Sequence, residues 1–243
     1  MKMPKVNPKA LLELDEVRAA VETAKATGPL EAALFSWMYE FGARAAEPGL
    51  QRLDDVDLRT KRARVIHLKS SSAIVRGRVQ GQEWDAMLPL CCELLPLWLK
   101  TRPSCIIEAG QKPYLFPSRF PGTCPACKGS GQRPAMRERV WTTVHCHHCG
   151  GTGKRWGLSR HEVYHIVTDL LKRAGVAPGH RHPHTLRHSI ITHLLEGDVT
   201  AGVIQERVGH RFLATTLSYA RATKVARLKL EGALSGLYGR SKQ

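Results

Sequence analysis

Two closely similar cysteine motifs constrain the fold of this chain more than any other feature of its sequence. Cys124-Pro-Ala-Cys127-Lys-Gly-Ser-Gly is echoed, after residues 128–145, by Cys146-His-His-Cys149-Gly-Gly-Thr-Gly. Two Cys-x-x-Cys pairs at this separation are typical of zinc sites, and four thiolates leave no open position on the metal. The spacing therefore predicts a structural Zn²⁺ bound by Cys124, Cys127, Cys146 and Cys149.

The residues around these cysteines support the predicted zinc site and also offer alternatives to it. The glycines after each pair let backbone amides turn toward the thiolates. The knuckles resemble those in the zinc region of Hsp40-type chaperones, but there are two here and not four, so a chaperone function does not follow. Free thiols are one alternative, and substitution by neighbouring imidazoles is another, from His145, His147 or His148.

The cysteine-rich stretch interrupts a chain that otherwise has helical patterning. Apolar periodicity is absent from about residue 120 to 153, where Gly, Cys, His and Pro dominate. We expect an α+β fold that is mostly helical, with a small antiparallel sheet from residues 62–68 and 84–90. The expected helices are 14–26, 30–41, 94–100, 159–171, 185–196, 200–208 and 214–230. The predicted domain is discontinuous, residues 1–119 and 154–243, with a zinc-binding insert at 120–153.

The charge balance points to a polyanionic partner. Lys and Arg total 37 against 21 Asp and Glu, a net charge of +16. Nucleic acid is the leading candidate, because each neutralised phosphate releases counterions. No apolar run approaches the ~20 residues of a membrane-spanning helix, and no signal peptide is evident. Cysteines without a secretion signal favour a reducing cytoplasm, so we expect a cytoplasmic protein.

A second set of residues has the chemistry needed to cleave DNA strands without a metal. Two guanidiniums can bind the non-bridging oxygens of a phosphodiester and stabilise the charge of its transition state. A phenol can attack in line, a lysine can protonate the departing 5′-oxygen, and imidazoles can donate hydrogen bonds or accept the phenol proton. The candidates for these roles are Arg44, Arg187, Tyr219, Lys69, His184 and His210.

The pattern of these residues resembles the tyrosine recombinase (phage integrase) family. The likeness rests on Gly-Ala-Arg-x-x-Glu at 42–47, His-x-x-Arg-His at 184–188 and Gly-His at 209–210, with Tyr219 nine positions after His210. It covers about residues 10 to 225, except the insert. The resemblance implies a catalytic fold of that family, with no cofactor or metal in the chemistry and a 3′-phosphotyrosyl intermediate.

The resemblance also implies a role for each residue. Arg44 and Arg187 would hold the scissile phosphate. His184 and His210 would form hydrogen bonds with this phosphate and assist proton transfer. Lys69 would be the general acid and Tyr219 the nucleophile. Glu47 would buttress the Arg44 turn, and His188 would support the site. Competing general acids are Arg76 and Arg78, and competing tyrosines are Tyr39, Tyr114, Tyr164 and Tyr238.

The expected function is that of a site-specific recombinase or integrase, acting on double-stranded DNA from a self-associated, tetrameric synapse. An accessory protein is a possible further partner, and a prokaryote, phage or mobile element a fitting source. About ten residues precede the first helix, so we expect no N-terminal core-binding domain, as in the single-domain invertases of fimbrial switches. Alternatives are a type IB topoisomerase, a non-catalytic DNA-binding regulator and, last, a zinc-dependent chaperone or RNA-binding module.

Basic residues in and beside the insert suggest that it contacts DNA, with a protein contact as the alternative. They are Arg133, Arg137, Arg139, Arg155 and Arg160.

Overall fold

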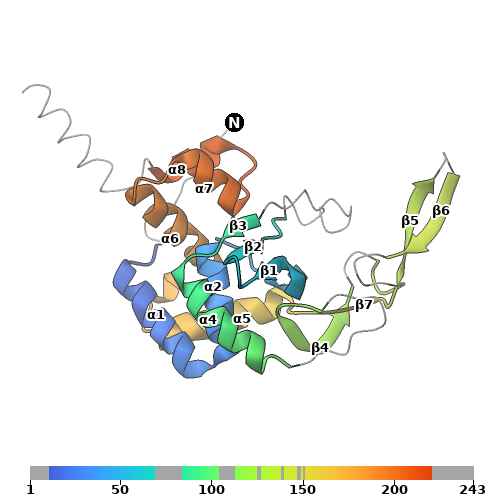
Figure 1. The fold of residues 1–243 in the computed structure, drawn as a ribbon, viewed down its shortest axis with the longest axis horizontal. Helices are drawn as coiled ribbons and strands as arrows, with labels where there is room; N and C mark the ends of the chain where they lie inside the picture. The colour runs from blue at the N-terminus through green and yellow to red at the C-terminus, as the bar shows by residue number, and fades with distance from the viewer. Residues whose placement is uncertain are drawn as a thin grey trace, which may run out of the picture.

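A computed structural model shows a helical body from which a long β-structure projects (Figure 1). It describes residues 11–68, 84–103, 113–124, 127–137, 140–146, 149 and 151–220. The predicted α+β, mostly helical fold with a small antiparallel sheet is confirmed. Among the described residues, no helix has both the length and the apolar character that a membrane crossing requires.

Helix α2 (Pro29–Glu40) forms the centre of the body. Residues 32–40 are all buried, which is expected of a helix that other helices surround. It packs against α1 (Leu14–Thr27), α4 (Pro89–Thr101), α5 (Arg160–Arg173) and α6 (Pro183–Glu196). Aromatic rings of Trp37, Phe41 and Phe116 meet in this core, with the Trp37 and Phe41 centroids 4.7 Å apart.

The helix starts follow the local signals in the sequence. At α5 the Ser159 hydroxyl accepts from the Glu162 amide at 3.0 Å, and the Glu162 carboxylate accepts from the Ser159 amide at 2.7 Å. These two hydrogen bonds form a capping box, the pattern that Ser159 and Glu162 indicate in the sequence. Helix α7 (Ala201–Val208) ends at Gly209, and α8 (Leu213–Ala220) follows it. The rest of the helix expected at 214–230 lies outside the described residues.

A three-stranded antiparallel sheet lies beside the helices. Its order is β1 (Val56–Asp57), β2 (Arg62–Arg64), β3 (Trp84–Ala86). Strands β2 and β3 pair with Arg62 opposite Ala86, so the predicted pairing of 62–68 with 84–90 is confirmed over a shorter length.

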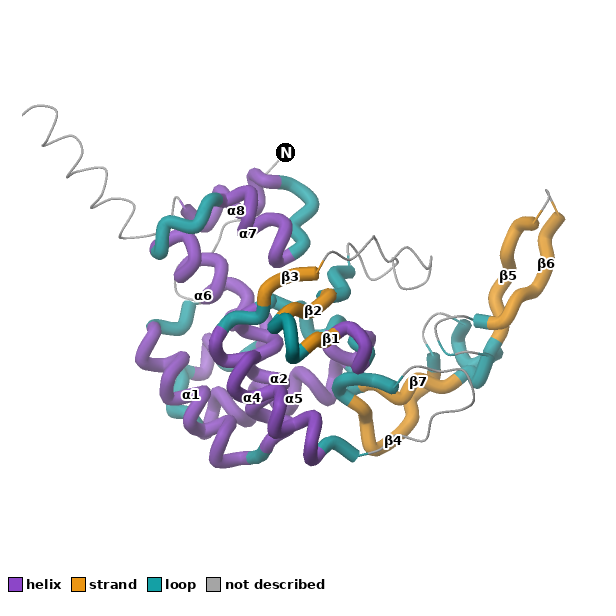
Figure 2. The backbone as a smooth tube through the Cα atoms, viewed as in Figure 1, coloured by secondary structure: helices purple, strands orange, loops and turns teal. Residues whose placement is uncertain are grey.

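The projecting β-structure contains the cysteine pairs and has two parts. Strands β4 (Pro117–Thr123) and β7 (Lys154–Gly157) form a paired stem. Strand β4 includes residues 120–123 of the predicted insert, and residues 124–153 lie between the two strands. Beyond the stem, β5 (Gln132–Arg137) and β6 (Val140–His145) form a regular hairpin. Figure 2 shows both parts extending away from the helical body.

The root of the stem touches the helical body backbone to backbone. A Cβ added to Gly49, in the short 3₁₀ turn Pro48–Leu50, would lie 1.8 Å from the Leu158 carbonyl oxygen. A Cβ on Gly157 would lie 2.0 Å from the Gly49 carbonyl oxygen. Leu158 also donates its amide to the Phe116 carbonyl at 2.9 Å. Only glycine permits this approach, so the stem is fixed to the turn that follows residue 47.

We therefore expect Gly49→Ala to lower the melting temperature, because the added methyl has no space beside the Leu158 backbone. Overpacking of this kind costs ~1–3 kcal/mol. The control is Gly202→Ala in α7, where a Cβ meets nothing within 4 Å, and which should leave the melting temperature unchanged or slightly raised. Equal melting temperatures for the two variants would contradict the role assigned to Gly49.

Candidate active site and cysteine cluster

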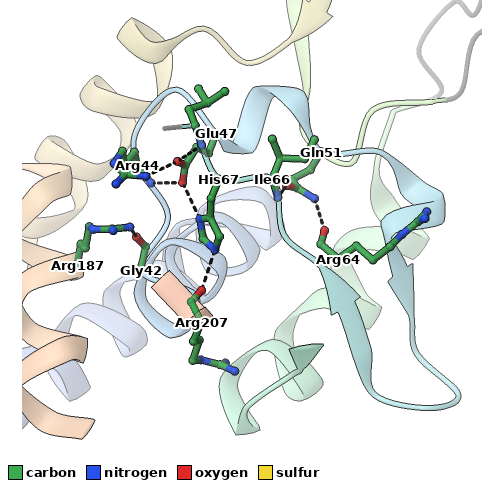
Figure 3. A network of polar contacts seen from close by, with 10 residues as sticks. Gly42, Arg44, Glu47, Gln51, Arg64, Ile66, His67, Arg187 and Arg207 are labelled. Carbon is green, nitrogen blue, oxygen red and sulfur yellow. Dashed lines mark hydrogen bonds and ion pairs between the residues drawn. The ribbon is translucent and has the colours of Figure 1, made fainter. Parts of the chain in front are cut away.

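The Arg44 turn is built around one buried carboxylate. After α2 the chain turns at Gly42, whose φ of +57° is in the left-handed region. Glu47 is fully buried and accepts from the Arg44 amide at 2.7 Å and from the Arg44 Nη1 at 2.9 Å (Figure 3). Glu47 therefore holds both the backbone and the side chain of Arg44.

Arg187 joins the same turn from α6. Its Nη1 donates to the Gly42 carbonyl at 2.5 Å, and its side chain is almost completely buried. Its Nη2 is also buried and has no hydrogen-bond partner among the described residues. Burial, followed by the charge of Arg44, lowers the pKa of Arg187 to about 10, which still leaves a cation at neutral pH. An unpaired buried donor on a cation suits an anionic oxygen from outside the chain.

His67 links this turn to the end of α7 and was not identified from the sequence. Its Nε2 donates to the Arg207 carbonyl at 2.7 Å, and its Nδ1 lies 3.4 Å from Glu47 Oε2. A Cβ on Gly209, which has a φ of +65°, would lie 2.5 Å from His67 Cγ. Nothing in the spacing around His67 signals this role, because its partners are about 20 and 140 positions away.

Arg207 and Gln51 are two further positioning residues that sequence reasoning missed. The Arg207 Nε donates to the Glu40 carbonyl at 2.9 Å and its Nη1 to the Ala86 carbonyl at 3.0 Å, so it joins the ends of α2 and β3. Gln51 donates to the Arg64 carbonyl at 2.8 Å and accepts from the Ile66 amide at 2.6 Å. The loop after residue 47 is thereby tied to β2 and the segment that follows it (Figure 3).

Three histidines and one tyrosine lie together beside the two arginines. The ring centroids of His184 and His188 are 4.2 Å apart, and those of His188 and Tyr219 are 5.2 Å apart. The His210 ring stacks on Tyr219 at 6.2 Å. The charges of both arginines act on His210 and Tyr219. The structure thus brings together the predicted residues Arg44, His184, Arg187, His188, His210 and Tyr219.

All three of these imidazoles are neutral at physiological pH. Burial, and after it the charge of Arg187, lowers the pKa of His184 to about 4. Burial, followed by the charges of Arg187 and Arg44, lowers the pKa of His210 to about 3. Burial is the main cause that lowers the pKa of His188 to about 4, and the electrostatic interaction with the neighbouring His184 is the second. His210 Nδ1 lies 2.8 Å from the Thr216 hydroxyl, whereas His188 Nδ1 is buried without a hydrogen-bond partner in the described part of the chain.

Tyr219 is 4 % exposed and packs against Ile191, Ile204 and Val208. Burial raises its pKa, and the charges of Arg187 and Arg44 only partly offset this. A phenol with a raised pKa needs a base to attack, and neutral imidazoles lie next to it.

The competing tyrosines that the structure describes have other surroundings. Tyr39 shares a hydrogen bond of 2.8 Å with His193, and Tyr114 lies under the Arg52 guanidinium. Tyr164 is 45 % exposed on α5. Tyr238 lies outside the described residues, as do Lys69 and its competitors Arg76 and Arg78, whose roles stay predictions.

The four predicted cysteines form a cluster that could hold a metal ion. Their Sγ atoms all lie within 4.8 Å of one another, and all four side chains are buried. The knuckles are related by a local pseudo-symmetry: the Gly131 amide donates to Cys127 Sγ at 3.3 Å, and the Gly153 amide donates to Cys149 Sγ at 3.2 Å. The glycines therefore turn amides toward sulfur as predicted. His147 and His148 lie outside the described residues.

The sequence of this chain is similar to one family of known proteins. Residues 10–225 match the profile of the Phage integrase family. The tyrosine recombinase XerD of Mycobacterium tuberculosis strain H37Rv is 30% identical over 224 residues, covering 89% of this chain and 57% of the relative. The tyrosine recombinase XerA of Pyrococcus horikoshii is 29% identical over 225 residues, covering 91% and 60%. The chain thus spans less than two thirds of the length of these relatives.

Solved structures agree at the level of the fold. The crystal structure of XerA recombinase has a TM-score of 0.62 at 21% identity, covering 100% of this chain and 68% of that one. The pre-cleavage complex of XerH site-specific recombinase with difH substrate has a TM-score of 0.60 at 19% identity, covering 97% and 56%. The predicted catalytic fold is confirmed, and the chain belongs to the Phage integrase family.

Proposed function

We propose that this chain cuts and rejoins duplex DNA through a 3′-phosphotyrosyl intermediate on Tyr219, as a site-specific recombinase. The observation that carries the proposal is the junction of Arg44 and Arg187 through the turn at Gly42, with the Tyr219 ring and neutral imidazoles beside it. The names of the relatives support it, since XerD and XerA are tyrosine recombinases.

The two arginines would bind the scissile phosphate. Arg187 offers the buried Nη2 that has no acceptor among the described residues, and Arg44 is one-third exposed beside it. A phosphate oxygen would complete the hydrogen bonding of Arg187, and both cations would stabilise the charge that develops in the transition state. Because Glu47 already fixes Arg44, little reorganisation would be needed when DNA binds.

The reaction balances with residues of this chain alone. The Tyr219 oxygen attacks phosphorus and the bond from phosphorus to the 5′-oxygen breaks. The phenol proton passes to a neutral imidazole, for which His188 Nδ1 is unpaired, and Lys69 protonates the departing 5′-oxygen. Lys69 follows Leu68, whose amide donates to Glu47 at 2.8 Å beside the Arg44 turn. The phosphodiester energy stays in the phosphotyrosine, so religation needs no ATP.

The proposal extends to partners. The XerH structure is bound to difH substrate and the Tn1549 transposon integrase to circular intermediate DNA, which supports double-stranded DNA as the substrate of this chain. We propose that copies self-associate on DNA in a tetrameric synapse. Exchange of strands between two specific sites distinguishes this function from a type IB topoisomerase, which relaxes supercoils. A non-catalytic regulator would not need a tyrosine beside the arginines.

We also propose that Cys124, Cys127, Cys146 and Cys149 bind one structural Zn²⁺. The donor set fits this metal, because four buried thiolates close a tetrahedral shell and glycine amides stabilise their charge. The metal would fix the module and take no part in strand cleavage.

The chemistry can be tested with nicked suicide duplexes that carry candidate junction sequences, on which a covalent protein–DNA adduct accumulates. We expect Tyr219→Phe to abolish the adduct, because the attacking oxygen is gone. Tyr164→Phe, at an exposed position on α5, is the matched control and should keep it. Denaturing electrophoresis measures both. An adduct that persists in Tyr219→Phe would refute the assignment of the nucleophile.

The neutral histidines predict that the free energy of unfolding falls as the pH is lowered from 7 to 5. Unfolded histidines take up protons near pH 6.5, whereas His188 and His210 in the folded chain do so only near 4 and 3. The unfolded state therefore binds more protons in this range, and acid favours it. Urea unfolding at several pH values measures the slope.

The double variant His188→Gln, His210→Gln should show a shallower slope over the same pH range. The control is His165→Gln, at an exposed position on α5, which should leave the slope unchanged. A slope that is equally steep in the double variant would show that other groups cause it.

The metal proposal predicts about one Zn²⁺ per purified chain, lost on Cys127→Ser because a serine hydroxyl is a poor ligand. Metal analysis and limited proteolysis are the measurements, and the variant should be cut faster within residues 124–149. Cys92→Ser, at a half-buried cysteine outside the cluster, should keep the metal. Metal-free wild-type protein, or full retention in Cys127→Ser, would contradict the proposal.

A further inference from the structure

One face of the β5–β6 hairpin is exposed to solvent. The pairs of the two strands run from Gln132 opposite His145 to Arg137 opposite Val140, without a break in register. The exposed face carries exposed side chains only, among those described, and Trp141 on this face is 67 % exposed. A two-stranded hairpin is at best marginally stable alone in water, so a hairpin that projects from the body with an exposed tryptophan would be stabilised by a partner.

The cysteine cluster holds the base of this hairpin. The Cys146 amide donates to the Gly131 carbonyl at 2.8 Å, directly next to the pair formed by Gln132 and His145. The Gly131 amide in turn donates to Cys127 Sγ. A Cβ on Gly131 would lie 2.0 Å from the Gly151 carbonyl oxygen, so the two knuckles interlock beneath the strands. The base of the hairpin is therefore held by hydrogen bonds and close backbone contacts within the cysteine cluster.

The charge of this region favours a polyanion as the partner. Between residues 128 and 155 the sequence has one acidic residue, Glu138, and several basic ones. The basic residues are Lys128, Arg133, Arg137, Arg139, Lys154 and Arg155. A strongly basic segment with an exposed aromatic side chain is typical of nucleic-acid contacts, whereas the core of a protein interface is depleted in charge.

The root of the module places it beside the proposed DNA site. Gly157 and Leu158 contact Gly49, which follows Glu47 by two residues in the turn that fixes Arg44. A duplex whose phosphate lies at Arg44 and Arg187 therefore passes near the start of the stem. The hairpin lies at the far end of the stem from the helical body (Figure 1).

We propose that the β5–β6 hairpin is a β-ribbon that enters the major groove of duplex DNA outside the cleaved phosphate. The major groove, ~12 Å wide, admits a two-stranded ribbon. Each strand has six residues, which at ~3.4 Å per residue spans ~20 Å, or roughly six base pairs at ~3.4 Å each. This inference rests on the proposed function, because it needs DNA at the arginine pair.

The test shortens the hairpin and leaves its base in place. Replacing residues 133–144 by Asn-Gly keeps the cysteines and the pair of Gln132 with His145, joined by a two-residue turn. Unchanged Zn²⁺ content and melting temperature establish that the body is intact. Binding to a random-sequence duplex of about 40 base pairs is then measured between 50 and 200 mM salt by fluorescence anisotropy, the range in which phosphate contacts dominate.

We expect the shortened variant to bind about tenfold more weakly at 50 mM salt. Its salt dependence should be less steep, because each lost phosphate contact reduces the slope of log K against log salt by ~0.9. Arg133→Gln should show part of this loss. Arg18→Gln, which removes the same charge from an exposed position on α1, should show none. Equal binding and slope for the shortened and wild-type chains would overturn the inference.

Selection from duplexes with 40 random base pairs tests entry into the groove. Wild-type protein should enrich a core sequence plus an outer block of roughly six base pairs, and the shortened variant only the core. Identical selected sequences overturn the inference, as does a change confined to self-association in sedimentation, which would mark a protein contact. Wild-type protein that binds no duplex at all overturns the proposed function as well, so the two failures are distinguishable.

Discussion

The site depends on the burial of a single carboxylate. Glu47 has no access to solvent, and a buried carboxylate without partners is costly. Its partners come from three places: the backbone and side chain of Arg44, the Leu68 amide and the His67 ring. Burial alone would raise the pKa of Glu47, but His67 and Arg44 outweigh it and the pKa is lowered. The charge is therefore stable only when the segments that hold Arg44 and His67 are assembled.

This arrangement fixes most of the polar groups of the site and leaves a buried guanidinium nitrogen without a partner among the described residues. Arg44 and the first nitrogen of Arg187 are bonded within the chain, whereas Arg187 Nη2 has no described acceptor. His188 and His210 are held neutral beside these cations, so the positive charge of the centre is concentrated on two guanidiniums. An arriving phosphate would meet cations that are already oriented and imidazoles able to accept a proton.

The sequence was informative wherever a short segment contains its own signal. Ser159 and Glu162 form a capping box within four residues. The spacing of the two cysteine pairs predicts the cluster that their side chains form. His67 and Arg207 were missed because their roles come from partners that only the tertiary fold brings near. The strands of the stem were missed for a related reason: Gly, Pro and Arg in residues 117–123 conceal a strand that exists through its pairing with β7.

The stem also bears on how such a module can be exchanged. Pro117 and Gly157 are paired where the stem meets the helical body, so the chain leaves the body and returns to it at neighbouring points, and Thr123 and Lys154 are paired at the other end of the stem. The entropy of closing a loop grows only slowly with its length, and the stem has already brought the ends together. Segments of quite different length can therefore connect Thr123 to Lys154 without displacing Gly49, Arg44 or Arg187. The stem therefore separates a part of the chain that can vary in length from the part that must hold Arg44 and Arg187 in place.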